Sequence, residues 1–175
     1  MTMPLAREDL FRNLAQLGIE TETVQHAALF TVEESKRLRG DIPGAHTKNL
    51  FLKSKKDELF LLVALESTPI ALAGLHKEIG CARLSFGKPE LLWQRLGVRP
   101  GAVSPFALIN DTDNRVALLL DAALLRFDRL NFHPLDNTAT TGIQREAFLR
   151  FLRAAGHEPR VLHFSETGVE RAPHT

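Results

Sequence analysis

The chain has 175 residues, of which 44% are hydrophobic and 25% are charged. These are ordinary globular values, so they exclude a disordered or collagen-like polypeptide and predict one domain over residues 1–175. The 22 Lys and Arg residues against 21 Asp and Glu give a formal net charge of +1. That balance argues against a strongly basic DNA-packing protein.

Cysteine content and hydropathy narrow the expected compartment. Cys81 is the only cysteine, so the chain can form no intramolecular disulfide, and a cysteine-based zinc site is not expected. Residues 1–9 lack the apolar core of a signal peptide. The apolar runs Leu59–Leu65 and Val116–Leu120 are too short to cross a bilayer. We therefore expect a cytoplasmic protein with no membrane partner.

The first third of the chain alternates between helical and strand-like patterns. Leu10, Leu14 and Leu17 have the spacing of one helical face, and a glycine follows as a stop signal. In chain order we expect a helix ended by Gly18, a strand over Thr21–Gln25, a short helix from the capping-box pair Thr31 and Glu34 to about Gly40, and a loop over Asp41–Gly44.

The centre of the chain predicts β-structure. Two strand-like runs, Thr47–Lys53 and Leu59–Ala64, are joined by the polar turn Ser54–Glu58. The second run is apolar at every position, so we expect both of its faces to be buried. Next we expect a helix over Ala71–Ile79 ended by Gly80, a strand over Ala82–Phe86 and a helix from Pro89 to about Leu96.

The last third mixes strands with one clear helix. We expect a loop from Gly101, two strands, a polar hairpin tip at Asp136–Asn137, a helix over Ile143–Ala155 ended by Gly156, an edge strand over Val161–Phe164 and ten loose C-terminal residues. Strands and helices follow one another without strict β–α–β alternation. The pattern therefore favours the α+β fold class.

Lys48 is the first candidate functional residue. Side chains alternate along a strand, so Lys48 shares a face with Leu50 and Leu52. One interpretation is a strand-end lysine whose ammonium reaches water along its stem. The other is a cation at the mouth of a pocket, where it could hold a phosphate or a carbonyl oxygen.

Two further segments could contribute to a site. In Gly101–Phe106, Gly101 allows close backbone approach, Ser104 offers a hydroxyl and Pro105 restricts the loop, so backbone N–H groups could point at an acyl oxygen. His133 follows a predicted strand and precedes several amide and hydroxyl groups. Each segment has a plain structural interpretation too, as a turn and as a structural or exposed histidine.

Other chemistries have weaker support. A Ser/His/Asp triad can be drawn from Ser104, His133 and either Asp121 or Asp128, but no Gly-x-Ser-x-Gly elbow is present. The seven histidines are scattered, and convergence of His26, His46, His76 and His133 on a metal is not indicated by their spacing. No phosphate-binding loop or dinucleotide fingerprint occurs, so no metal and no cofactor are expected. Basic clusters occur at Lys36, Arg37 and Arg39, at Lys53, Lys55 and Lys56, and at Arg145, Arg150 and Arg153.

Three motifs in order resemble one family. Thr47-Lys48-Asn49-Leu50-Phe51-Leu52-Lys53, then Gly101-x-Val103-Ser104-Pro105-Phe106, then Phe132-His133-Pro134-Leu135-x-Asn137 with Thr140-Thr141 are similar to the YbaK/ProRS-associated editing-domain superfamily. Within it, the pattern resembles the branch of free-standing prolyl-tRNA editing proteins that remove mischarged alanine. The resemblance runs from the first helix to Gly156–Pro159.

The resemblance implies a fold, an activity and a set of residues. The fold would be a YbaK-like α+β domain with a mixed, mainly antiparallel sheet or partial barrel and surrounding helices. The activity would be metal-independent hydrolysis of mischarged Ala-tRNA(Pro), with prolyl-tRNA synthetase as a possible partner. Lys48, Gly101 and His133 align with the catalytic positions, and the substrate-binding positions would be Asn49, Arg83, Ser104, Pro105 and Asn137.

Two alternatives remain at this level. The acyl group could belong to a mischarged Cys-, Ser- or Thr-tRNA. The chain could instead be a non-catalytic RNA- or DNA-binding module that uses the basic clusters, although it has no Tyr and one Trp with which to stack bases.

Overall fold

The computed structural model describes residues 3–28, 33, 37, 42–165 and 168–171. The helices are α1 (Arg7–Gln16), α3 (Leu72–Ile79), α4 (Pro89–Leu96) and α5 (Arg145–Ala154), with the 3-10 helices η1 (Pro105–Asn110) and η2 (Ala122–Arg126). The strands are β1 (Thr21–Gln25), β2 (Ala45–Ser54), β3 (Leu59–Leu65), β4 (Leu84–Phe86), β5 (Val116–Asp121), β6 (Arg129–Phe132), β7 (Ala139–Gln144), β8 (Arg160–Ser165) and β9 (Gly168–Arg171).

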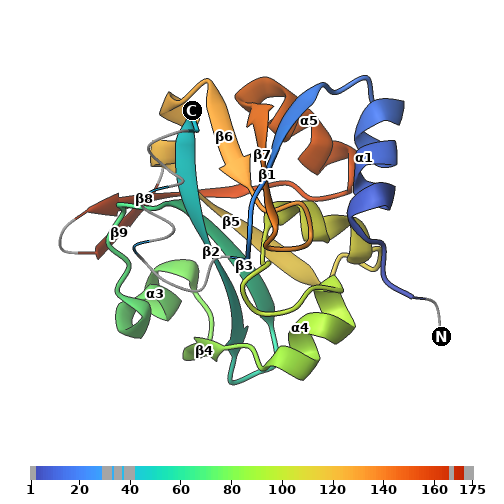
Figure 1. The fold of residues 1–175 in the computed structure, drawn as a ribbon. Coiled ribbons are helices and arrows are strands. Elements are labelled where there is room, and N and C mark those ends of the chain that lie inside the picture. The colour runs from blue at the N-terminus through green and yellow to red at the C-terminus, as the bar shows by residue number, and fades with distance from the viewer. Residues whose placement is uncertain (1–2, 29–32, 34–36, 38–41, 166–167, 172–175) are drawn as a thin grey trace.

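The strands form one open, mixed sheet in the order β1-β7-β6-β2-β3-β5-β8-β9 (Figure 1). Strand β4 is outside this linear order and pairs with β2. Pairing is antiparallel for β1–β7, β6–β7, β2–β3, β2–β4 and β8–β9. It is parallel for β2–β6, β3–β5 and β5–β8. The predicted α+β class and the mainly antiparallel mixed sheet are therefore confirmed.

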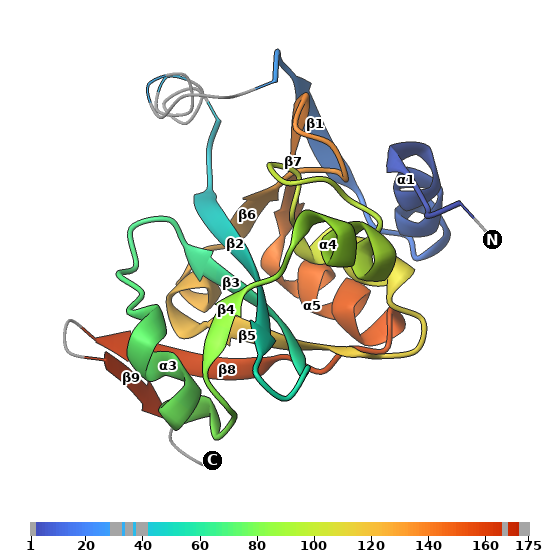
Figure 2. The same ribbon diagram turned by 90° about the horizontal axis from the view of Figure 1, so that it is seen from below.

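Helices cover both faces of the sheet, as the view from below shows (Figure 2). The larger apolar cluster joins α1, α4, η1 and α5 to one face, through residues such as Leu14, Leu96, Phe106 and Phe151. The smaller cluster joins α3 to the other face, where Leu75 packs with Leu52 and Leu62. Among the described residues, no helix combines the length and the apolar character that a membrane crossing requires.

Strand β2 separates the two clusters, and this alternation sets the orientation of its polar residues. Phe51 faces the larger cluster and Leu52 faces the smaller one. Lys48 lies an even number of residues from Leu52, so its side chain leaves the strand on the face of the smaller cluster. The prediction that Lys48 shares a face with Leu50 and Leu52 is confirmed.

Most predicted elements are present close to their expected bounds. Strand β1 has the predicted bounds, and the two helices after β3 end at Gly80 and Gly97, both in the left-handed conformation. Strand β3 is buried at every position except its last, as its apolar run predicts. The predicted helix from Thr31 to Gly40 lies outside the described residues, apart from isolated positions.

The differences from the sequence prediction include β7, β9 and β4. Ile143 belongs to β7 rather than to a helix, because β7 is held by β1 on one side and by β6 on the other. Residues 168–171, expected to be loose, pair with β8 as β9. Strand β4 begins at Leu84, not at Ala82.

Candidate functional site

Lys48 extends from β2 across the end of β3. Its strand position pairs with Ala64, and its ammonium donates a hydrogen bond to the backbone carbonyl of Thr68, in the turn after β3. The side chain is only partly buried. The ammonium is therefore held by the turn that follows β3 rather than left free in water.

The turn that receives Lys48 is itself fixed by a buried carboxylate. Asp121 is 1% exposed, and its Oδ2 accepts hydrogen bonds from the Leu65 N–H (3.0 Å) and the Thr68 hydroxyl (2.6 Å). Its Oδ1 accepts from the Ala123 N–H at 3.0 Å. Sequence reasoning considered Asp121 only as a triad member and missed this contact, because it joins residues 53 and 56 positions apart.

His133 directly follows β6, which pairs with β2. The parallel register pairs Ala45 with Leu130 and His46 with Asn131. The pairing ends at these residues: Lys48 lies two positions beyond His46 in β2, and His133 directly follows Phe132, the last residue of β6. The two main candidates of the sequence, 85 positions apart in the chain, therefore both lie just beyond the paired part of two adjacent strands.

The surroundings of His133 keep its ring neutral. Burial lowers the pKa of His133 below its ordinary value of 6.5, and nearby His26 also lowers it, while the bond to the Ala139 carbonyl and the Asp136 charge act in the opposite direction. The His133 Nδ1 lies 2.9 Å from the Ala139 carbonyl oxygen, which can only accept, so Nδ1 carries the hydrogen. The Nε2 of a neutral ring is then a hydrogen-bond acceptor.

A second histidine, which the sequence did not single out on its own, accompanies His133. The ring centroids of His26 and His133 are 6.2 Å apart. His26 Nε2 lies 2.9 Å from the Thr140 hydroxyl, and the His26 N–H donates to the Thr138 carbonyl at 2.9 Å. The end of β1 thus borders the segment that carries His133.

Gly101 and Asn137 face each other across the same region. Gly101 has a φ of +92°, a conformation that glycine adopts without strain. A Cβ at position 101 would lie 3.6 Å from Asn137 Nδ2, so the Gly101 backbone is in near contact with this amide. The structure therefore brings together the predicted glycine loop and the residues after His133.

The remaining candidates occupy different places. The Asn49 side chain leaves β2 on the opposite face from Lys48. Its Nδ2 donates a hydrogen bond to the Thr47 hydroxyl at 3.3 Å. Its buried Oδ1 has no hydrogen-bond partner within the described part of the chain. Ser104 and Pro105 are buried, and the Ser104 hydroxyl accepts from the Phe106 N–H at 3.2 Å as the cap of η1. Ser104 therefore has a structural contact at the start of η1, and its predicted contact with substrate stays a prediction.

Arg83 lies far from these groups. Its carbonyl accepts from the Lys55 N–H, beside the end of β2 at Ser54. A strand rises about 3.3 Å per residue, so Ser54 is roughly 20 Å along β2 from Lys48. The exposed Arg83 side chain is thus placed to meet a different part of any substrate than Lys48 does.

The Ser/His/Asp triad is not formed. Ser104, His133 and Asp121 are bonded to Phe106, Ala139 and Thr68 respectively. The side chain of Asp128 is exposed and lies 3.5 Å from Arg145. Among the residues that the structure describes, no three His, Cys, Asp or Glu side chains gather as metal ligands, and His46 bonds to the Ile42 carbonyl instead.

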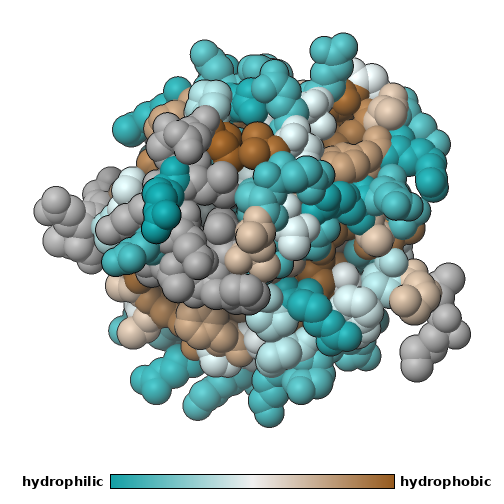
Figure 3. Space-filling model, viewed as in Figure 1, coloured by the Kyte–Doolittle hydropathy of each residue, from teal (hydrophilic) through white to brown (hydrophobic). Residues whose placement is uncertain are grey.

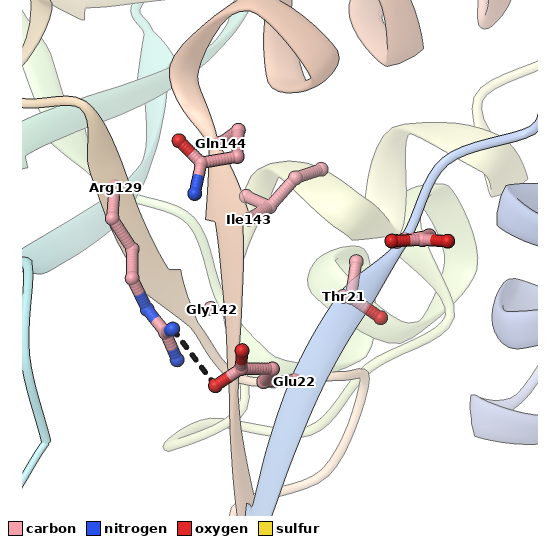
Figure 4. A pocket seen from close by; sticks show the side chains of 7 residues that line it. Thr21, Glu22, Arg129, Gly142, Ile143 and Gln144 are labelled. Atoms are coloured by element: carbon pink, nitrogen blue, oxygen red, sulfur yellow. Dashed lines mark hydrogen bonds and ion pairs between the residues drawn. The ribbon is translucent and has the colours of Figure 1, made fainter.

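Two surface hollows lie away from the predicted residues. One, of about 190 Å³, is lined by β1, β6 and β7, where Arg129 bonds to Glu22 at 2.9 Å and lies against Gly142 (Figure 4). The other, of about 430 Å³, lies beside β5 and His157. The face seen in Figure 1 is mostly hydrophilic and shows apolar residues only in small groups (Figure 3).

Comparisons with known proteins point to one family. The aminoacyl-tRNA editing domain matches residues 26–151. A prolyl-tRNA synthetase associated domain-containing protein 1 from Danio rerio is 39% identical over 160 residues, covering 90% of this chain and 87% of the relative. The prolyl-tRNA editing protein ProX of Acetoanaerobium sticklandii is 31% identical over 153 residues, covering 87% of this chain and 93% of its own length.

The fold has solved counterparts. The crystal structure of a candidate trans-editing enzyme for prolyl-tRNA synthetase superposes with a TM-score of 0.67 at 18% identity. The match covers 94% of this chain and 99% of that one. This chain and that protein therefore share the architecture described above.

Proposed function

This chain belongs to the aminoacyl-tRNA editing domain family, and from that premise we propose that it is a trans-acting deacylase that hydrolyses mischarged Ala-tRNA(Pro). One observation carries the proposal: the family match over residues 26–151 contains Lys48, the Gly101 loop and His133. Relatives named for prolyl-tRNA synthetase and prolyl-tRNA editing support tRNA(Pro) as the nucleic-acid partner. Such a substrate implies a cytoplasmic protein that works beside prolyl-tRNA synthetase.

Editing compensates for the limited selectivity that substrate binding alone can provide. Alanine fits inside a site built for proline, and each missing methylene is worth only about 1–3 kcal/mol in binding. A second, smaller pocket can hydrolyse alanine and exclude proline. The deacylase supplies that second selection.

The proposed chemistry uses a positioned water and a stabilised oxyanion on an already activated ester. Lys48 would hold the terminal phosphate or ribose and so orient the ester. Backbone groups of the Gly101 loop would stabilise the oxyanion. His133, neutral and with Nε2 as an acceptor, would hydrogen-bond the substrate, and no step requires a metal.

The other candidates would bind substrate at a distance from the reacting carbon. Asn137 offers an amide near the Gly101 loop. Asn49 offers an amide on the face of β2 opposite Lys48. Arg83, roughly 20 Å along β2 from Lys48, would meet the phosphate backbone of the tRNA rather than the acyl group.

The first test is substitution of Lys48. Lys48→Ala should lower single-turnover hydrolysis of Ala-tRNA(Pro) at least about tenfold, because orientation of the ester is lost. Lys77→Ala, which removes an exposed lysine from α3, is the control and should keep wild-type rates. Circular dichroism and thermal melting check the fold of both. Near-wild-type turnover in Lys48→Ala would contradict the assignment.

The acyl group is decided by a panel of mischarged tRNAs. We expect Ala-tRNA(Pro) to be hydrolysed first, Ser- and Gly-tRNA(Pro) more slowly, and Pro-tRNA(Pro) hardly at all, because overfilling a rigid pocket costs about 1–3 kcal/mol. Binding of tRNA should weaken with salt, since phosphate contacts release counterions. Rates should survive dialysis against chelators. Preference for a Cys- or Thr-tRNA would identify a different editing enzyme, and rapid hydrolysis of Pro-tRNA(Pro) would contradict the role.

A further inference from the structure

Asp121 joins two segments at the end of β3: the turn from Leu65 to Thr68, and the start of η2 after β5. Its carboxylate accepts from the Leu65 N–H, the Thr68 hydroxyl and the Ala123 N–H, at 3.0, 2.6 and 3.0 Å. Leu65 and Thr68 are the two ends of one turn, closed by the bond from the Thr68 N–H to the Leu65 carbonyl at 3.0 Å. A single buried carboxylate therefore holds both ends of the turn and ties it to the end of β5.

The same turn receives the side chain of Lys48. The Thr68 carbonyl accepts the Lys48 ammonium, and Thr68 is itself 8% exposed. The direction of this carbonyl depends on the orientation of the Thr68 peptide, which Asp121 fixes through the Thr68 hydroxyl. The contacts thus form a continuous chain from Asp121 through Thr68 to Lys48.

We propose that Asp121 is a positioning residue, which holds the Lys48 ammonium at one point by fixing the turn that carries the Thr68 carbonyl. That this point matters for deacylation rests on the proposed function. The physical reason is the stem of lysine: its four flexible carbons leave the ammonium many alternative positions unless an acceptor selects one. A displacement of about 1 Å in a reacting complex can lower a rate about a hundredfold.

Thr68→Val is the sharpest variant, because it removes the hydroxyl that Asp121 accepts and keeps both the side-chain shape and the Thr68 carbonyl. Thr23→Val is the matched control. It removes a similar hydroxyl, 2.9 Å from that of Thr141, on the opposite face of the sheet from Lys48. Asp121→Asn is a second variant, which also removes the buried charge.

The first readout is the reactivity of Lys48 itself. Each protein is treated briefly with an acylating reagent, and the labelling of Lys48 is measured by mass spectrometry relative to exposed Lys77 in the same sample. Labelling of Lys48 should rise several-fold in Thr68→Val and Asp121→Asn and stay unchanged in Thr23→Val. Unchanged labelling in Thr68→Val, or an equal rise in Thr23→Val, would overturn the proposal.

The second readout is deacylation of Ala-tRNA(Pro) at a temperature well below the melting point of every variant. Thr68→Val should lower the single-turnover rate about tenfold. In a Lys48→Met background the same substitution should cause no further loss, because Asp121 acts through Lys48. A further loss in that background would overturn the proposal.

The two readouts separate the inference from the function on which it rests. If the wild-type protein hydrolyses no mischarged tRNA, the proposed function fails while the labelling result still decides the role of Asp121. If Asp121→Asn does not fold, Thr68→Val, which removes one hydrogen bond, decides alone.

Discussion

His133 shows how a single residue acquires a chemical state from its surroundings. The Ala139 carbonyl fixes the hydrogen on Nδ1, and burial disfavours the charged ring. The result is a neutral imidazole at pH 7, in which Nε2 is the acceptor nitrogen. Such a ring can accept a hydrogen bond from a ribose hydroxyl or a water, which a protonated ring cannot do.

The pKa of His133 can be measured directly. We expect its NMR titration midpoint to lie below 6.5, because burial and the nearby His26 disfavour the charged form. Asp136→Asn should lower the midpoint further, since the carboxylate that favours the charged ring is lost. As pH falls, His133 takes up its proton at a higher pH in the unfolded chain than in the folded protein. The contribution of His133 to folding stability should therefore decrease as pH falls below about 6.5. A midpoint at or above 6.5 would contradict this assignment.

At the scale of the elements, the connection between β6 and β7 is held by α1. Asp136 Oδ1 accepts from the Arg7 guanidinium, the Thr138 N–H and the Thr138 hydroxyl. Arg7 also donates to Gln25 at 2.9 Å, at the end of β1 next to His26. One arginine therefore joins the first helix to both segments that carry the paired histidines.

Removing this arginine should loosen the connection. Arg7→Met should lower the free energy of unfolding by about 1 kcal/mol, because charge-assisted hydrogen bonds are lost at a partly exposed site. Amide exchange of Thr138 and His26 should become faster. Arg12→Met is the control: Arg12 is 66% exposed and 3.4 Å from Asp9, so its loss should cost no more than about 0.5 kcal/mol. Equal effects in urea denaturation would show that Arg7 has no special role.

At the scale of the whole molecule, a buried His–Asp pair joins the helix layer to the sheet. His157, after α5, lies 2.8 Å from Asp111 Oδ2, and both side chains are at most 3% exposed. Asp111 also accepts from the N–H groups of Arg115 and Val116, at 3.0 and 2.8 Å, where β5 begins. This carboxylate fixes the start of a central strand against the end of the last helix.

Asp111→Ala should destabilise the protein strongly. The change leaves His157 and two N–H groups without their acceptor, and breaking a buried pair costs about 3–5 kcal/mol. Asp113→Ala, two residues away on an exposed side chain, should change the free energy of unfolding by less than about 0.5 kcal/mol. Guanidinium denaturation of both variants provides the comparison. A small effect of Asp111→Ala would mean that the pair contributes little to stability.

Local patterns in the sequence determined most of the elements and the family. Spacing of apolar residues predicts α1 and the completely apolar β3, and Gly80 and Gly97 end their helices because glycine adopts the left-handed conformation freely. The motifs around Lys48, Gly101 and His133 by themselves indicate an editing domain. These features depend only on neighbouring residues.

Contacts between distant segments were decided by the tertiary structure alone. The bonds from Asp121 to Thr68, from Arg7 to Asp136 and from His157 to Asp111 join residues 46 to 129 positions apart, and no local pattern predicts such a pairing. Ile143 is in a strand because two neighbours pair with β7, and Ser104 became a buried cap once η1 packed into the larger cluster. Local propensity is a weak preference, and the burial and hydrogen bonding of the assembled sheet override it.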